Sequence, residues 1–87
     1  MYRSAKYLDY IRAQPCLVCG GQSVAHHEPL GLAGMGIKAP DTHCIPLCHK
    51  HHRERHDTGK SFYVEHRIDP MMEIIKLLTR YMEEKGL

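Results

Sequence analysis

Residues 48–56 read Cys48-His49-Lys50-His51-His52-Arg53-Glu54-Arg55-His56, which places one cysteine and four histidines within nine residues. Residues in this part of the chain are spaced as on one face of a helix, so we expect a helix over about residues 47–56. At about 100° per residue, Cys48 and His51 share one side of this helix, while His52 and His56 lie together one turn along. The helix therefore predicts two separate groups of metal ligands.

A second cluster reads Cys16-Leu17-Val18-Cys19 and is followed by two glycines. This spacing is typical of a zinc knuckle, in which a tight turn directs two thiolates at one ion. Such a pair needs two more ligands, and the helix supplies them. We expect a closed structural zinc site at Cys16, Cys19, Cys48 and His51. Cys44 stays open as an alternative to His51, because Cys44 and Cys48 can also converge at a turn.

His52 and His56 present two imidazoles to one ion at i, i+4 spacing and still lack a third ligand. The pair His26-His27 can supply it. If residues 24–28 form a strand, the side chains of this pair point to opposite faces. One histidine then binds the ion while the other is free to handle a proton.

Two other arrangements of the same residues stay open. In the first, a single zinc ion binds four residues whose two pairs are much farther apart than the roughly 12 residues of a C₂H₂ finger. Those four are Cys16, Cys19, His52 and His56. In the second, the cysteines form a disulfide framework, because their count of four is even. Histidines crowd the same region, which favours metal binding.

The chain has 87 residues, enough for one small domain over residues 1–87. At this length the burial of apolar surface roughly balances the entropy lost when the chain is ordered. A thiolate-bound zinc ion contributes about 10–16 kcal/mol of folding free energy, enough to decide that balance. So small a core excludes a large buried cofactor pocket.

Neither a membrane-spanning stretch nor a signal peptide is apparent in the sequence. We therefore expect a cytoplasmic protein without membrane contact, in a reducing compartment where cysteines bind metal more often than they pair. The formal net charge is only +2 with histidines neutral, so contact with DNA requires a local basic face. Arg53, Arg55 and Lys38 are the side chains that we expect to bind the phosphate backbone.

Two amphipathic helices are expected near the ends of the chain. The first covers residues 4–11 with Ser4 as its N-cap, and the second covers about residues 69–85, where Asp69 and Pro70 form its start. The apolar face of the second helix, expected to be core or dimer surface, carries Met71, Ile74, Ile75, Leu78 and Met82. Between the helices, glycines and prolines separate apolar pieces that predict short strands at residues 17–18, 24–25 and 45–47.

In combination these motifs resemble the HNH endonucleases of the ββα-metal, or His-Me finger, group. The resemblance covers about residues 6–60 and is closest to the small phage-type branch that includes recombination-enhancement nucleases. It is carried by Cys16-x2-Cys19, Ala25-His26-His27, the Gly-rich stretch Gly34-x-Gly36-x-Lys38-x-x-Asp41, and Pro46-Leu47-Cys48-x2-His51-His52 with His56. It implies an α+β fold: a small ββα-metal core over about residues 14–60 with a zinc knuckle, flanked by N- and C-terminal helices.

The resemblance also implies a role for each matching residue. His26 is expected to bind the catalytic metal and His27 to act as general base, with His52 and His56 as the remaining ligands. In many relatives, zinc-binding cysteines occupy the positions of the knuckle set, which here has a histidine in place of the fourth thiolate. His43 falls on the middle position of the family motif, where it is expected to position the loop that carries the base.

The expected function is metal-dependent hydrolysis of DNA phosphodiester bonds, in which a histidine activates water and one divalent ion stabilises the leaving group. The resemblance implies 5′-phosphate and 3′-hydroxyl ends and a catalytic Mg²⁺, Mn²⁺, Ni²⁺ or Zn²⁺ ion beside the structural Zn²⁺. It also implies a place in phage or prophage recombination, with a recombination protein as partner. A homodimer through the last helix is a further expectation. The alternative function is a non-catalytic, zinc-stabilised module that binds DNA or protein.

Several polar residues lie outside both ligand sets. His49 is expected at the surface, and His66 at the surface or against a helix. Asp41 is expected either to orient a histidine through a hydrogen bond or to cap the turn after Pro40.

Overall fold

The computed structural model describes residues 2–30 and 39–87, which form a small mixed α and β structure with a two-stranded sheet. Its elements in chain order are α1 (Ala5–Arg12), β1 (Val24–His27), η1 (Asp41–His43), β2 (Cys44–Leu47), α2 (His49–Thr58), α3 (Ser61–Glu65) and α4 (Pro70–Lys85). The expected α+β class is therefore confirmed. The Gly-rich stretch at residues 31–36 and Lys38 lie outside the described residues.

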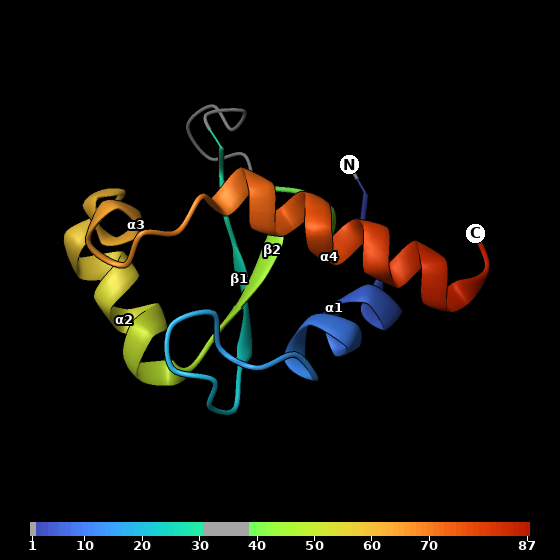
Figure 1. Ribbon diagram of the computed structural model, residues 1–87, viewed down its shortest axis with the longest axis horizontal. Coiled ribbons are helices and arrows are strands. Elements are labelled where there is room, and N and C mark those ends of the chain that lie inside the picture. The colour runs from blue at the N-terminus through green and yellow to red at the C-terminus, as the bar shows by residue number, and fades with distance from the viewer. Residues whose placement is uncertain (1, 31–38) are drawn as a thin grey trace.

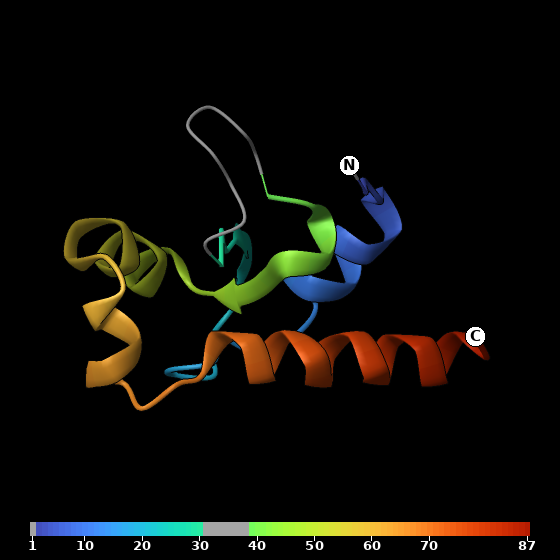
Figure 2. The ribbon, with the colours of Figure 1, turned by 90° about the horizontal axis from the view of Figure 1, so that it is seen from above.

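The two strands cross the centre of the molecule as an antiparallel pair (Figure 1). Val24 lies opposite Leu47, and His27 lies opposite Cys44. Figure 1 shows α2 and α3 on one side of the strands, α1 on the other, and α4 crossing the strands toward α1, and Figure 2 shows α4 running along one face of the molecule. Because elements cover it on both sides, every residue of β2 is buried, whereas β1 is mostly half-buried.

The predicted start signals of the two terminal helices are confirmed. The Ser4 hydroxyl accepts the N–H of Tyr7 at 3.1 Å, and Asp69 Oδ1 accepts the N–H of Met72 at 3.2 Å. Pro70 occupies the first turn of α4. Because the first N–H groups of a helix have no partner inside it, each such cap contributes about 1 kcal/mol of stability.

The expected strand at residues 17–18 is wrong. These residues lie in a turn, because the chain folds back between Cys16 and Gly21, whose backbone groups are joined by a 2.9 Å hydrogen bond. A strand cannot reverse direction within so few residues. The tight turn between the two cysteines therefore decides the conformation of Leu17-Val18, although both residues are apolar.

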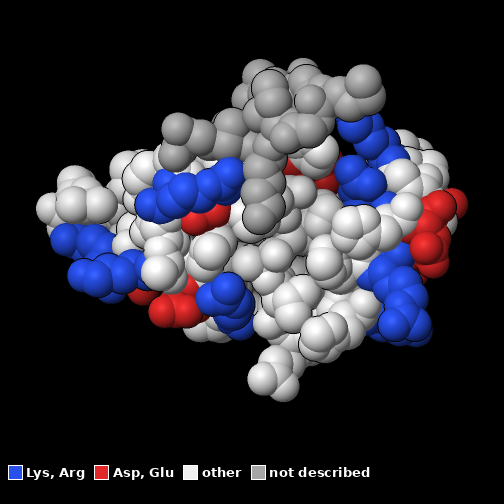
Figure 3. Space-filling view, turned by 180° about the vertical axis from the view of Figure 1, so that it is seen from behind, with Lys and Arg blue, Asp and Glu red and all other residues white. Residues whose placement is uncertain are grey.

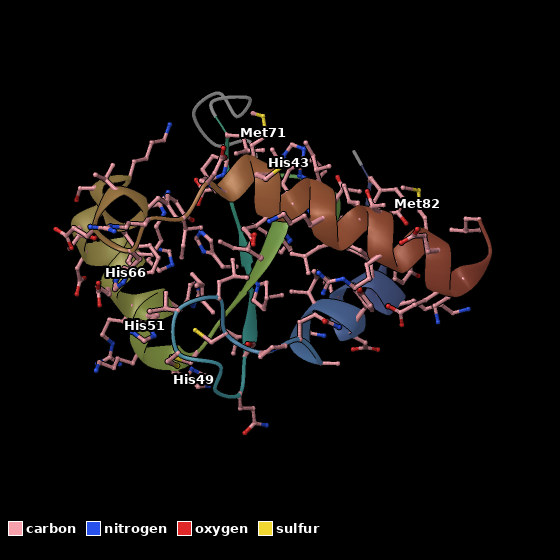
Figure 4. All side chains as sticks on the ribbon, in the orientation of Figure 1. His43, His49, His51, His66, Met71 and Met82 are labelled. Carbon is pink, nitrogen blue, oxygen red and sulfur yellow. The ribbon has the colours of Figure 1, made fainter. Side chains whose placement is uncertain are left out.

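The buried side of α4 agrees only in part with the predicted one. Ile74 enters the core and Leu78 packs against it, as predicted, and Leu77 is buried as well. Met71, Ile75 and Met82 are 54%, 51% and 44% exposed. Figure 4 shows Met71 and Met82 projecting from the same side of α4. Apolar residues occupy more than one side of this helix, so periodicity alone does not select the face that packs against β2 and α1. A homodimer through the exposed part stays a prediction.

The core joins all the layers. The short helix α3, which the sequence did not predict, adds two aromatic side chains to it, Phe62 and Tyr63. The other buried members of this core cluster are Tyr7, Ile11, Cys16, Cys44, Ile45, Leu47, Ile74 and Leu77. Within the described part of the chain, none of the helices combines the length and the apolar character needed to cross a membrane.

We expect Phe62→Ala to lower the free energy of unfolding by about 3–5 kcal/mol, because it removes a fully buried ring and leaves a cavity. Val64→Ala on the same helix is the matched control. Val64 is 80% exposed, so its truncation should change stability by no more than about 0.5 kcal/mol. Urea unfolding of the zinc-loaded protein measures both changes, and similar losses for the two variants would contradict the packing of α3.

Candidate metal centres

The loop after α1 turns tightly between its two cysteines. The N–H of Cys16 donates to the carbonyl of Gly21, and the N–H of Gly20 donates to the carbonyl of Cys16, both at 2.9 Å. Gly20 has φ of 75°, a left-handed conformation that glycine adopts without strain. The N–H of Leu17 donates to the carbonyl of Pro46 at 3.1 Å and so fastens the loop to β2.

The structure brings together the four residues predicted for the structural zinc site. Their ligand atoms, from Cys16, Cys19, Cys48 and His51, all lie within 4.8 Å of one another. Cys19 Sγ lies 3.7 Å from Cys48 Sγ, and Cys48 Sγ lies 3.1 Å from His51 Nδ1. Around a tetrahedral zinc ion with Zn–S bonds of about 2.3 Å, two sulfurs are about 3.8 Å apart. This Cys₃His cluster therefore has the size and donor set of a site for a metal ion such as zinc.

The cysteines inside and outside the cluster differ in their chemistry. Burial works to raise the pKa of Cys16, but hydrogen bonds from backbone N–H groups outweigh it and lower the pKa to about 6. This favours the thiolate, which is the metal-binding form. Cys44 is fully buried outside the cluster, and burial raises its pKa to about 12. All four cysteines are free, so the structure contains neither the disulfide framework nor a ligand role for Cys44.

The residues predicted for the second metal site converge as well. The ring nitrogens offered by His26, His52 and His56 lie within 4.8 Å of one another. His52 Nε2 lies 3.2 Å from His56 Nε2, close to the roughly 3.3 Å that separates two nitrogens on a tetrahedral ion. The arrangement with a single zinc is not formed, because His52 and His56 group with His26 and not with the knuckle cysteines.

This three-histidine cluster is closed on one side and open on the other. His26 is buried, His52 is half-buried and His56 is exposed. Burial, and then the neighbouring charges of His26 and His56, lower the pKa of His52, which favours the neutral imidazole that binds metals. Three protein ligands with one exposed edge are typical of a metal site that admits a further ligand.

A buried carboxylate supports the cluster from behind. Glu28 is 1% exposed, and its Oε1 lies 3.0 Å from His26 Nε2. Arg55 donates to both carboxylate oxygens, at 3.1 and 3.0 Å, and the Tyr63 hydroxyl donates to Oε1. Burial works to raise the pKa of Glu28, but the hydrogen bonds from His26, Arg55 and Tyr63 lower it to about 2. Glu28 is therefore ionised although it is buried.

Sequence reasoning missed Glu28 and placed Arg55 elsewhere. Residues i and i+2 of an extended segment share a face, so the spacing of His26 and Glu28 was a usable signal. Arg55, predicted to contact DNA phosphates, has a side chain only 11% exposed and pairs with Glu28 instead. Its guanidinium also lies over the ring of Tyr63, at 5.3 Å. Of the two arginines expected at the phosphate backbone, only Arg53 is exposed.

His27 points away from the cluster, as the alternation of strand side chains requires. Its side chain is 26% exposed, and Nε2 lies 2.8 Å from Asp41 Oδ1. Asp41 also accepts the Arg3 guanidinium at 3.0 Å and the N–H of Ser4 at 2.7 Å. Burial opposes the ionisation of Asp41, but the hydrogen bonds from His27, Ser4 and Arg3 lower its pKa to about 2. The expectation that Asp41 contacts a histidine is confirmed.

The remaining histidines take three different positions. The carbonyl of His43 accepts the N–H of Glu28 at 3.0 Å and so holds the end of β1, while the predicted role of its ring stays a prediction. His66 Nε2 lies 2.6 Å from Glu54 Oε1, and the ring centroids of His66 and His51 are 5.6 Å apart. Both contacts agree with the expected position of His66 against a helix. Figure 4 shows His51 and His66 where α2 and α3 meet, and His49, which is exposed, near the start of α2.

Basic side chains are distributed unevenly over the surface. Figure 3 shows a face on which Lys and Arg lie toward both ends, with uncharged residues between them. The expected contact of a local basic face with DNA stays a prediction.

Comparison with known proteins gives a family and a relative. The sequence profile of a family described as "Protein of unknown function (DUF968)" matches residues 1–83. A protein of Escherichia coli strain K12, described as "Uncharacterized protein YdfU", is 38% identical over 72 residues. The match covers 80% of this chain and 20% of that protein, so the chain spans about one fifth of the length of this relative. No solved structure matches the chain.

Cys48→Ala is expected to lose zinc from the Cys₃His cluster, because it removes one of the four ligand atoms. Cys44→Ala is the matched control and is expected to keep the zinc, since Cys44 lies outside the cluster. Mass spectrometry of the dialysed proteins measures metal content, and Co²⁺ substitution reports thiolate ligation by its charge-transfer absorption. Zinc loss from Cys44→Ala with retention in Cys48→Ala would overturn this ligand set.

In the folded protein, the thiol of Cys44 is expected to resist iodoacetamide at a pH near the ordinary thiol pKa of about 8.5. Its pKa is raised to about 12, so the thiol stays neutral there, and only the thiolate reacts. Unfolding in guanidinium chloride should restore ordinary reactivity. Peptide mapping by mass spectrometry measures the modification, and rapid labelling of Cys44 in the folded chain is the contrary result.

Proposed function

The chain belongs to the DUF968 family, and from the geometry of its metal-ligand clusters we propose that it is a metal-dependent endonuclease of the HNH type that hydrolyses DNA phosphodiester bonds. One observation carries the proposal. Three imidazoles from β1 and α2 converge beside solvent, and the next residue of β1 is a histidine held by a carboxylate. An open metal site together with a positioned base is what phosphodiester hydrolysis requires. The order of motifs along the chain supports the same assignment.

His26, His52 and His56 are the residues that would hold the catalytic metal. A divalent ion bound there supplies positive charge against the negative charge that develops on the phosphoryl and leaving oxygens. The three imidazoles orient the site, and the exposed edge at His56 lets a phosphate group approach.

His27 acts as the general base. Because Asp41 is ionised and accepts from Nε2, that nitrogen carries the hydrogen and Nδ1 keeps the lone pair. Water gives its proton to Nδ1 as its oxygen bonds to phosphorus and the bond to O3′ breaks. Asp41 stabilises the imidazolium that forms, and solvent protonates the leaving oxygen. The products are 5′-phosphate and 3′-hydroxyl ends.

DNA is bound through its phosphates and not through its bases. Arg53 is exposed on α2 directly after the ligand His52, which suits a phosphate contact near the metal. Arg55 serves the site indirectly, since Glu28 occupies its guanidinium. A place in phage or prophage recombination, with a recombination protein as partner, belongs to the proposal on the strength of the HNH resemblance alone.

His27→Ala is expected to keep the fold and the knuckle zinc and to slow nicking of supercoiled plasmid by about 10²–10⁴-fold, the usual contribution of a general base. His49→Ala is the matched control, because His49 is exposed on α2 outside both clusters. The assay compares Mg²⁺, Mn²⁺ and Ni²⁺ with and without chelator. Unchanged nicking by His27→Ala would remove His27 from the mechanism, and a wild-type protein inactive in all three ions would favour the non-catalytic module.

A further inference from the structure

We propose that Glu28 is a positioning residue for the three-histidine cluster: its buried carboxylate fixes the ring of His26 so that Nδ1 is the atom offered to the metal. The inference rests on the metal site of the proposed function, and it does not depend on whether the chain cleaves DNA. It concerns a residue that the order of motifs along the chain does not single out.

The hydrogen-bond pattern selects one tautomer of His26. Glu28 Oε1 already accepts the Tyr63 hydroxyl and Arg55 Nε, and Oε2 accepts Arg55 Nη2. A carboxylate surrounded by donors is an acceptor only, so at 3.0 Å the Nε2 of His26 must carry the hydrogen. A neutral imidazole protonated at Nε2 has its lone pair on Nδ1, and a metal binds to that lone pair.

The three ligands therefore differ in the atom that they present. The Nε2 atoms of His52 and His56 lie 3.2 Å apart and face each other. The Nε2 of His26 faces Glu28 instead. The ring of His26 lies 5.0 Å from that of His52 and 5.8 Å from that of His56, centroid to centroid, and one of its nitrogens lies within 4.8 Å of theirs. Because Nε2 faces Glu28, we take Nδ1 as the nitrogen that His26 offers. One ligand bound through Nδ1 and two bound through Nε2 follow from this arrangement.

Three elements hold the carboxylate in place. Glu28 directly follows β1, while Arg55 comes from α2 and Tyr63 from α3. Arg55 has a side chain 11% exposed and Tyr63 is 5% exposed, so neither partner is free to turn toward solvent. A carboxylate that orients a ligating histidine commonly sets both the ring orientation and the metal affinity.

Stability alone does not account for a carboxylate at this position. A buried ion pair is costly to desolvate, and apolar residues of similar volume are often equally stable or more stable. Glu28 accepts four hydrogen bonds from three side chains, and one of these side chains, His26, belongs to the cluster. The donors of Arg55 and Tyr63 thus hold the carboxylate where it contacts the ring of His26.

The test loads the full chain with zinc at the knuckle and titrates Co²⁺ or Zn²⁺ into the second site by calorimetry. Glu28→Gln is expected to weaken this second binding by about 10–100-fold while the knuckle zinc is retained. Glu54→Gln is the matched control, because Glu54 binds His66, a histidine outside both clusters. Tyr63→Phe, which removes one donor and keeps the carboxylate, is expected to weaken binding only a few-fold.

A two-bond ¹H–¹⁵N spectrum of the wild-type protein with Zn²⁺ gives the direct readout, even where Glu28→Gln fails to fold. We expect His26 to be bound through Nδ1 with its proton on Nε2, and His52 and His56 to be bound through Nε2. Metal on Nε2 of His26, unchanged affinity in Glu28→Gln, or no second-site binding by the wild type overturns the inference. Binding through Nδ1 in a protein that does not nick DNA supports the inference and contradicts the nuclease proposal alone.

Discussion

The register of β1 against β2 is the constraint on which both faces of the candidate site depend. Because side chains alternate along a strand, pairing His26 with Ile45 directs His26 toward α2 and His27 toward Asp41. A slip of one residue would exchange the two histidines and separate each from its partners. Two strands of four residues cannot hold a register in water by themselves. The complete burial of β2 under the surrounding elements supplies what the short ladder lacks.

The Cys₃His cluster holds together segments of a small chain that lie apart in the sequence. It joins the irregular loop at residues 16–21, the residue after β2 and the first turn of α2. Cys48 is also the N-cap of α2, where its sulfur accepts the N–H of His51 at 3.5 Å. Cys48 thus both starts α2 and places its sulfur beside the other ligands of the cluster. A metal ion held there stabilises the helix that carries His52 and His56, although the two clusters share no ligand.

The parts of the site that the sequence predicted are those with local geometry. A helix fixes the pairs at i, i+3 and i, i+4, and a tight turn fixes Cys16 and Cys19, so both ligand sets were within reach of spacing arguments. The hydrogen bonds around Glu28 could not be predicted in this way, because Arg55 and Tyr63 meet Glu28 only when α2 and α3 pack against the end of β1. The buried face of α4 was predicted only in part, for a related reason. Its apolar residues cover more than one side, and only packing decides which side is buried.

Adjacent histidines carry similar hydrogen bonds yet suit opposite tasks. Each donates Nε2–H to a carboxylate, His26 to Glu28 and His27 to Asp41. The surroundings differ, because His26 is 5% exposed and its carboxylate also accepts from a buried arginine. His27 is 26% exposed, so water can reach its ring. Burial, and not residue type, therefore separates the histidine of the cluster from the one that we propose as the base.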